Sequence, residues 1–157
     1  MIVVLQRVSS ASVAVDGKPK AAIGAGFVAL VGVRKGDDER SAEYLAHKVA
    51  GLRVFGDDGG RFNRDIVHPQ VRGAILAVSQ FTLLADCRRG RRPGFDAAET
   101  PRRAEALFEH FVAALRAANV PVETGSFGAT MRVELVNEGP VTIILDTERL
   151  NTTAPKS

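Results

Sequence analysis

Residues 79–83 form one of two short segments whose residue types and spacing could do chemistry. The segment reads Ser-Gln-Phe-Thr-Leu and brings two hydroxyls and an amide to the end of an apolar run. Backbone N–H groups that become free at a strand end can stabilise a developing oxyanion, and losing one such donor costs about 2.7–4 kcal/mol. A purely structural strand end is the alternative. The candidate catalytic residues are Ser79, Gln80, Phe81 and Thr82.

Residues 137–142 form the second segment, which reads Asn-Glu-Gly-Pro-Val-Thr and predicts a tight turn. Glycine adopts backbone angles that other residues cannot, and about 5–6% of X–Pro bonds in folded proteins are cis. A cis bond between Gly139 and Pro140 would turn two neighbouring carbonyls the same way. That rigid pair of acceptors could hold an ammonium group without any side chain, although an ordinary turn also fits these residues.

A cluster of four arginines follows the first segment and concentrates positive charge. The cluster consists of Arg88, Arg89, Arg91 and Arg92. The net charge is +3 and the sequence pI is about 9.4, whereas acidic residues gather elsewhere, as at residues 37–39. Because the planar guanidinium fork suits phosphate oxygens, the cluster predicts contact with a nucleic-acid backbone. A solvated loop is the alternative.

Other kinds of site find little support in the sequence. The three histidines share no metal-ligand spacing with the single cysteine or with a carboxylate pair, so we expect no metal site and no cofactor. No histidine is near Cys87 in the sequence, which favours a loop cysteine over a nucleophile. Neither a phosphate-binding glycine loop nor a Gly-x-Ser-x-Gly elbow occurs.

The composition of the 157 residues indicates the framework that must position these segments. Hydrophobic residues make up 45% and charged residues 25%, which is typical of one globular domain. No stretch has the roughly 18 apolar residues of a membrane span, and the first residues favour a strand over a signal peptide. A single cysteine excludes an internal disulfide framework, so we expect a cytoplasmic protein without membrane contact.

About seven strands and two helices are expected. An Asp-Gly pair at residues 16–17 predicts a hairpin. One helix should begin after Asp37 or Asp38, and the better helix should begin after Thr100, with a proline at its first position. Residues 84–99 predict a long basic loop, and such loops often have a function. The strands read directly from apolar patterns are 1–8, 12–15, 27–33, 74–78, 131–135 and 141–145.

Together these elements predict a single α+β domain over residues 1–147. We expect a mixed or antiparallel, barrel-like sheet with the helices packed on one side. Residues 148–157 are polar and predict a disordered C-terminal tail.

The motifs, taken in this order and at this chain length, resemble those of the D-aminoacyl-tRNA deacylases. The resemblance covers about residues 1–147 and departs from the family pattern at Gly94, where serine is frequent, and beyond residue 147. The motifs that support it are Gln6-Arg7 in the opening strand and residues 79–83, 92–95 (Arg-Pro-Gly-Phe), 101–105 (Pro-Arg-Arg-Ala-Glu) and 137–142.

The resemblance implies a cytoplasmic homodimer with shared active sites, which hydrolyses the ester joining a D-amino acid to the 3′ adenosine of tRNA. Gly139 and Pro140 would enter the partner's site, where their carbonyls face the substrate ammonium and exclude L-amino acids. Glycine has no side chain to clash, so glycyl-tRNA should also be hydrolysed. The substrate-binding residues implied are Arg7, Phe127, Met131, Asn137, Gly139 and Pro140.

The resemblance also assigns roles within that set. Arg7 would help to fix the Gly-Pro turn, and Phe127 and Met131 would cradle the terminal adenine. Two mechanisms are open. Thr82 could be a nucleophile that forms an acyl-enzyme, although no activating base is evident in the sequence. The resemblance favours the other, in which the tRNA 2′-hydroxyl assists and the N–H groups of Phe81 and Thr82 stabilise the developing charge.

Two other functional classes compete with this interpretation. A non-catalytic RNA-binding or tRNA-binding protein would use the arginine cluster without needing both motifs intact. An unrelated Ser/Thr hydrolase of small esters or amides would need a base and would have no use for the basic loop. The preferred D-amino acid and the preferred tRNA do not follow from the sequence.

Overall fold

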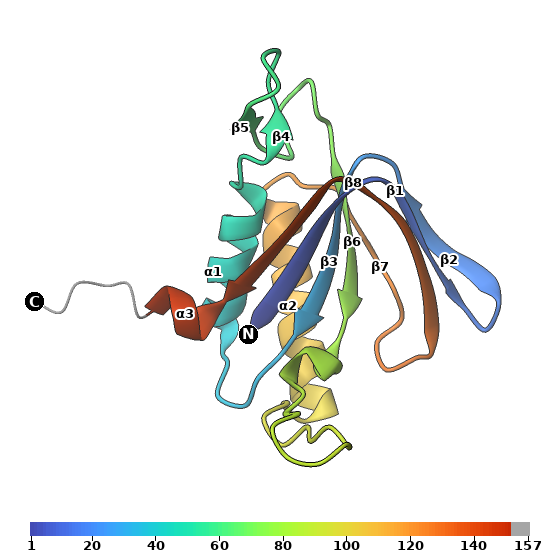
Figure 1. Ribbon diagram of the computed structural model, residues 1–157, viewed down its shortest axis with the longest axis vertical. Helices are drawn as coiled ribbons and strands as arrows, with labels where there is room; N and C mark the ends of the chain where they lie inside the picture. Colours follow the sequence, from blue (N-terminus) through green and yellow to red (C-terminus); the bar gives the residue numbers. More distant parts are fainter. Residues whose placement is uncertain (152–157) are drawn as a thin grey trace, which may run out of the picture.

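A six-stranded mixed sheet forms the centre of the computed structural model, which describes residues 1–151 (Figure 1). The strand order is β2-β1-β3-β6-β7, and β8 pairs along β1. The β3–β6 and β6–β7 pairs are parallel and the others antiparallel, so the predicted α+β class with a mixed sheet is confirmed. The strands are β1 (Ile2–Val15), β2 (Lys18–Ile23), β3 (Gly26–Gly32), β6 (Ala74–Ser79), β7 (Val122–Thr124) and β8 (Met131–Asp146).

β1 changes neighbours along its length and so curls the sheet toward a barrel. Residues 2–8 pair with β3, whereas residues 11–15 pair with β2 across a hairpin at Asp16 and Gly17. Both turn residues have positive φ, as the Asp-Gly pair predicted. The prediction of two strands within residues 1–15 is wrong, because β8 pairs on both sides of the polar residues between them.

The inner strands β3 and β6 are buried on both faces. Alternate β3 residues enter different apolar clusters: Phe27, Ala29 and Val31 lie under the helices, whereas Val28 packs with Leu76 inside the curled sheet. Burial of both faces explains the uninterrupted apolar run that predicted β3.

Two helices cover one face of the sheet (Figure 1). α1 (Glu39–Ala50) begins after Asp38, whose carboxylate accepts the Ser41 N–H at 2.8 Å. α2 (Pro101–Ala117) begins after Thr100 with proline in its first turn. Both starts match the prediction. The buried residues are Ala42, Leu45, Ala46 and Val49 of α1, and Leu107, Phe108, Phe111, Val112 and Leu115 of α2.

A small hairpin that the sequence did not predict stands outside the main sheet. β4 (Phe55–Gly56) and β5 (Phe62–Arg64) are antiparallel and are joined by an Asp/Gly turn. Phe55 fixes this hairpin to the core because its ring packs on Phe27 with centroids 5.0 Å apart.

The C-terminal part of the chain differs from the prediction. Residues 131–135 and 141–145, expected as two strands, belong to the single strand β8, which contains the predicted turn as an irregularity. The two halves join because both pair with β1. A short helix, α3 (Thr147–Asn151), follows where the disordered tail was expected, and residues 152–157 lie outside the described residues.

Candidate active site

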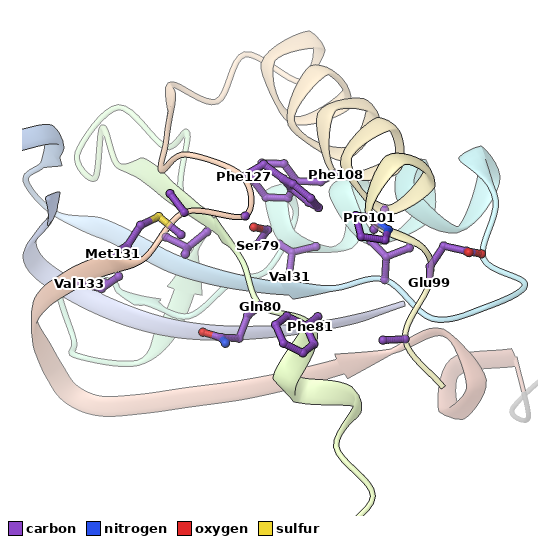
Figure 2. A pocket seen from close by; sticks show the side chains of 16 residues that line it. Val31, Ser79, Gln80, Phe81, Glu99, Pro101, Phe108, Phe127, Met131 and Val133 are labelled. Atoms are coloured by element: carbon purple, nitrogen blue, oxygen red, sulfur yellow. The ribbon is translucent and has the colours of Figure 1, made fainter. Parts of the chain in front are cut away.

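A cavity of about 460 Å³ opens beside the end of β6 (Figure 2). Ser79, Gln80 and Phe81 come from the first predicted segment, and the other lining residues come from β3, β6, α2, β8 and their flanking loops. The volume and the mostly apolar lining are typical of a small-molecule or nucleoside site. The other lining residues are Val31, Val33, Val78, Ala98, Glu99, Pro101, Ala104, Phe108, Phe127, Gly128, Ala129, Met131 and Val133.

The first segment ends β6 and begins a short 3₁₀ helix, η1 (Phe81–Leu84). The Gln80 N–H still donates to the Val31 carbonyl at 2.7 Å, after which the chain leaves the sheet. The first N–H groups of a helical turn have no acceptor within that turn. Phe81 and Thr82 are the first two residues of η1, so their N–H groups have no acceptor within that turn.

Thr82 is not among the cavity-lining residues, and its hydroxyl already has a partner. Gln80 Nε2 donates to Thr82 Oγ1 at 2.5 Å. Within residues 1–151, no histidine, lysine or carboxylate is hydrogen-bonded to this hydroxyl. Among the described residues, no general base is hydrogen-bonded to Thr82 in the way that an activated nucleophile requires.

Aromatic side chains face the cavity from opposite sides. Figure 2 shows Phe127 and Phe81 on opposite sides of Ser79, with Met131 at one end. Phe127 packs on Phe108 of α2 with ring centroids 6.3 Å apart. A planar base can stack on such rings. Both residues implied to cradle adenine, Phe127 and Met131, therefore lie on the cavity.

The basic loop is tied to the same wall. Phe95 packs edge-on against Phe81 with centroids 5.0 Å apart, and backbone hydrogen bonds of 2.8 and 2.9 Å between Asp86 and Gly94 close the loop. Arg88 donates two side-chain hydrogen bonds back to Asp86, at 2.9 and 2.7 Å, and these hold the pKa of that carboxyl at about 2. The remaining loop arginines, Arg89, Arg91 and Arg92, are exposed.

The second segment is braced by side chains on both sides of its turn. Asn137 Oδ1 accepts the Val141 N–H at 3.1 Å, and its Nδ2 donates to Thr142 Oγ1 at 3.2 Å. The Gly139–Pro140 peptide bond is cis. Arg7, implied to fix the turn, donates from Nε to the Glu138 carbonyl at 3.1 Å. Asn137 thus stabilises the turn by hydrogen bonds to the residues that follow it.

One chain does not bring the two segments together. Ser79 pairs with Val31 on β3, whereas Arg7, beside the turn, pairs with Phe27 four residues earlier. At about 3.3 Å per residue and 4.8 Å per strand, the segments lie roughly 13 Å apart along the strands and roughly 14 Å apart across them. The cavity lining includes neither Gly139 nor Pro140.

Sequence reasoning did not assign the supporting role of two aromatic residues, one beside each segment, although it included Phe95 in a family motif. Phe95 supports Phe81, and Phe62 of β5 lies under the guanidinium of Arg7, with Cζ 5.4 Å from the ring centroid. An aromatic residue isolated in a polar, glycine-rich stretch was the available signal for Phe62. Residues 1–151 contain no group of three or more His, Cys, Asp or Glu side chains placed to hold a metal ion. Among the same residues, no helix is both long and apolar enough to cross a membrane.

Comparison with known proteins places nearly the whole chain in one family. A family model described as D-Tyr-tRNA(Tyr) deacylase matches residues 4–146. A D-aminoacyl-tRNA deacylase of Symbiobacterium thermophilum is 58% identical over 146 residues, which is 93% of this chain and 95% of that protein. One from Thermomicrobium roseum is 57% identical over 150 residues, 96% of each chain.

Solved structures agree on the fold. The structure of a c-Myc DNA Unwinding Element Binding Protein has a TM-score of 0.85 at 37% sequence identity and covers 94% of this chain and 99% of its own. The structure of a probable eukaryotic D-amino acid tRNA deacylase has a TM-score of 0.77 at 17% identity, over 92% of this chain and 97% of its own. With the family match over nearly the whole chain, these similarities show that the chain belongs to the D-Tyr-tRNA(Tyr) deacylase family.

Proposed function

We propose that this protein hydrolyses the ester bond of D-aminoacyl-tRNA and releases a free D-amino acid and tRNA. The observation that best supports the proposal is the cavity at the end of β6, which Ser79, Gln80 and Phe81 line together with the aromatic side chain of Phe127. The terminal adenosine stacks in the aromatic part, and the ester lies near the N–H groups of Phe81 and Thr82. Because aminoacyl-tRNA is used in the cytoplasm, we propose that the protein acts in that compartment.

Chirality is read by the backbone of a second subunit. In a homodimer, the Gly139–Pro140 turn of one subunit completes the cavity of the other, because the two segments are too far apart within one chain. Carbonyls of the turn accept the substrate ammonium, so an L-amino acid would direct its side chain into the turn and a D-amino acid would not. Glycyl-tRNA is hydrolysed as well, since glycine has no side chain to exclude.

The 2′-hydroxyl of the terminal ribose assists the reaction. The Thr82 hydroxyl accepts a hydrogen bond from Gln80 and has no hydrogen-bonded base among residues 1–151, which supports a role for the protein in positioning and in oxyanion stabilisation. The ester carbonyl oxygen would then lie near backbone N–H donors of η1. The loop arginines, Arg88, Arg89, Arg91 and Arg92, contact tRNA phosphates.

The test is ester loss from matched D- and L-aminoacyl-tRNA carrying the same amino acid. We expect rapid loss of the D ester only. No loss of either ester would instead indicate a nucleic-acid-binding protein, a class that the name of the 37%-identical structure also suggests. Turnover of small esters without stereoselectivity would indicate a general Ser/Thr hydrolase.

A further inference from the structure

Phe62 is a large apolar side chain left 57% exposed on β5, between polar neighbours. Its ring lies against the guanidinium of Arg7, with Cζ 5.4 Å from the ring centroid. Guanidinium groups within about 6 Å of an aromatic centroid are attracted to the ring face. The exposed ring thus has a specific neighbour in the chain, and that neighbour contacts the Gly-Pro turn.

The hairpin holds the Phe62 ring in a fixed place. Asp57 accepts the N–H groups of Gly59 and Arg61 at 2.9 and 3.0 Å, which closes the hairpin turn. Arg64 Nη1 donates to the Gly56 carbonyl at 2.9 Å, across the two strands. The preceding Phe55 packs in the core. The β4–β5 hairpin, which carries Phe62, is therefore held both at its turn and where Phe55 enters the core.

Arg7 joins three segments that are far apart in the sequence. Nη1 donates to the Val54 carbonyl at 2.5 Å, Nε donates to the Glu138 carbonyl at 3.1 Å, and Phe62 covers the guanidinium. Glu138 immediately precedes Gly139, so the direction of the Arg7 fork fixes the start of the turn. The Phe62 ring covers one face of the guanidinium that these two hydrogen bonds orient.

We propose that Phe62 is a positioning residue for the Gly139–Pro140 turn, acting through Arg7, and that it thereby sets the preference for D over L substrates. This inference rests on the proposed function, in which the turn reads chirality. A displacement of the turn carbonyls by about 1 Å would weaken discrimination between D and L substrates, because catalysis requires closely defined distances between the reacting groups.

The test compares Phe62→Leu with Phe62→Tyr, measuring kcat/KM on matched D- and L-aminoacyl-tRNA together with Tm. Leucine keeps an apolar side chain but removes the ring. Loss of an exposed cation–π contact changes the equilibrium between the docked and undocked Arg7 side chain by about two- to fivefold. We expect the D/L ratio of kcat/KM to fall about two- to fivefold in Phe62→Leu. Phe62→Tyr should keep the wild-type ratio because it keeps the ring.

Two further variants make the result specific. Arg7→Lys should lower the ratio, and Val67→Ala, which shortens an exposed apolar side chain elsewhere, should not. An unchanged ratio in Phe62→Leu, with the ratio lowered in Arg7→Lys, overturns the inference even if Tm falls. A wild-type protein with no D preference would instead overturn the proposed function, so the two failures are distinguishable.

Discussion

Gly139 shows how, at the scale of one residue, backbone takes the place of side chain in the proposed site. Its φ is +131°, a conformation that L side chains rarely adopt. A Cβ there would lie 2.8 Å from Val141 Cγ2 and 3.0 Å from Arg7 Nη2. Glycine is therefore required both by the backbone angle and by the space around it.

Gly139→Ala should reduce kcat/KM on D-aminoacyl-tRNA by about tenfold or more, since a strained backbone position costs of order 1–3 kcal/mol and distorts the turn. Steady-state kinetics with both enantiomers would measure the loss. Gly24→Ala is the matched control, because a Cβ at Gly24 meets no atom within 4 Å. Wild-type activity and selectivity in Gly139→Ala would contradict the role of the turn.

Thr82→Ala should retain most of the activity, because in the part of the chain that the structure describes the Thr82 hydroxyl is bonded to the Gln80 amide and to no base. Single-turnover ester hydrolysis, with tRNA binding measured in parallel, tests this expectation. A fall to the uncatalysed rate with binding intact would favour the nucleophile mechanism. No acyl-enzyme should accumulate in either protein.

At the scale of elements, the basic loop presents four exposed arginines. Arg88 pairs with Asp86 within the loop, and Arg89, Arg91 and Arg92 follow it. Phe95 connects the same loop to Phe81 at the cavity. Phosphate contacts by the loop would therefore lie next to the bound 3′ end.

Replacing the three loop arginines that follow Arg88 with Gln should make tRNA binding less sensitive to salt. Each lost phosphate contact lowers the slope of log K against log salt by about 0.7 for single strands and 0.9 for duplex. Titration of binding at several salt concentrations gives the slope. Lys18→Gln/Lys20→Gln/Lys48→Gln removes equal charge elsewhere and should leave it nearly unchanged. An equal slope in the arginine variant and the wild type would show that the loop does not contact phosphate.

The end of β8 is linked to the segment after β3 by a half-buried ion pair. Arg34 donates to Asp146 at 3.1 and 3.3 Å, and the Glu148 N–H donates to the same carboxylate at 3.0 Å. Burial alone would raise the pKa of Asp146, but these hydrogen bonds outweigh burial and hold the pKa below its usual range. A depressed carboxyl pKa stabilises the fold above the unfolded-state pKa, near 3.9.

Asp146→Asn should therefore destabilise the protein at neutral pH, by about 1–3 kcal/mol. The difference from wild type should shrink as pH falls below about 4, where the wild-type carboxylate is protonated and its contribution is lost. Denaturant unfolding at pH 7 and pH 3 measures both values. The exposed Asp96→Asn is the control, and a difference independent of pH would contradict this account.

For the whole molecule, the proposed site would be complete only in a dimer. Val136 and Ile144 are exposed by 56% and 59% on β8, on either side of the turn. Exposed apolar residues flanking a functional loop are typical of an interface. Two identical chains related by a twofold axis would exchange their turns reciprocally.

Complementation between subunits tests this arrangement. Ala129→Trp fills the cavity and Gly139→Ala distorts the turn, so the activity of each homodimer should fall by about tenfold or more. Dimers exchanged between the two variants should regain activity, because one of their sites combines an intact cavity with an intact turn. If each site belonged to a single chain, mixing would restore nothing. The double variant Val136→Lys/Ile144→Lys places charges on the exposed apolar residues beside the turn. It should sediment as a monomer, and it should have lost D-specific ester hydrolysis.

Local patterns in the sequence determined much of the fold and both chemical segments. The Asp-Gly hairpin, the continuous apolar run of β3 and the proline at the start of α2 depend on neighbouring residues alone, so they could be predicted. The same holds for Ser79 to Phe81 at a strand end. The family motifs added the roles expected of Phe127 and Met131, which line the cavity.

Tertiary structure alone decided how distant segments combine. The 137–140 turn lies inside one strand because β1 pairs with both sides of it, and Arg7 joins Val54, Phe62 and Glu138 through contacts across 47 to 131 residues. Pairing between residues so far apart in the sequence depends on the register of the whole sheet, and a pattern of neighbouring residues cannot predict that register. The sequence by itself determined which residues could do chemistry, and only the fold showed that one chain keeps the two segments apart.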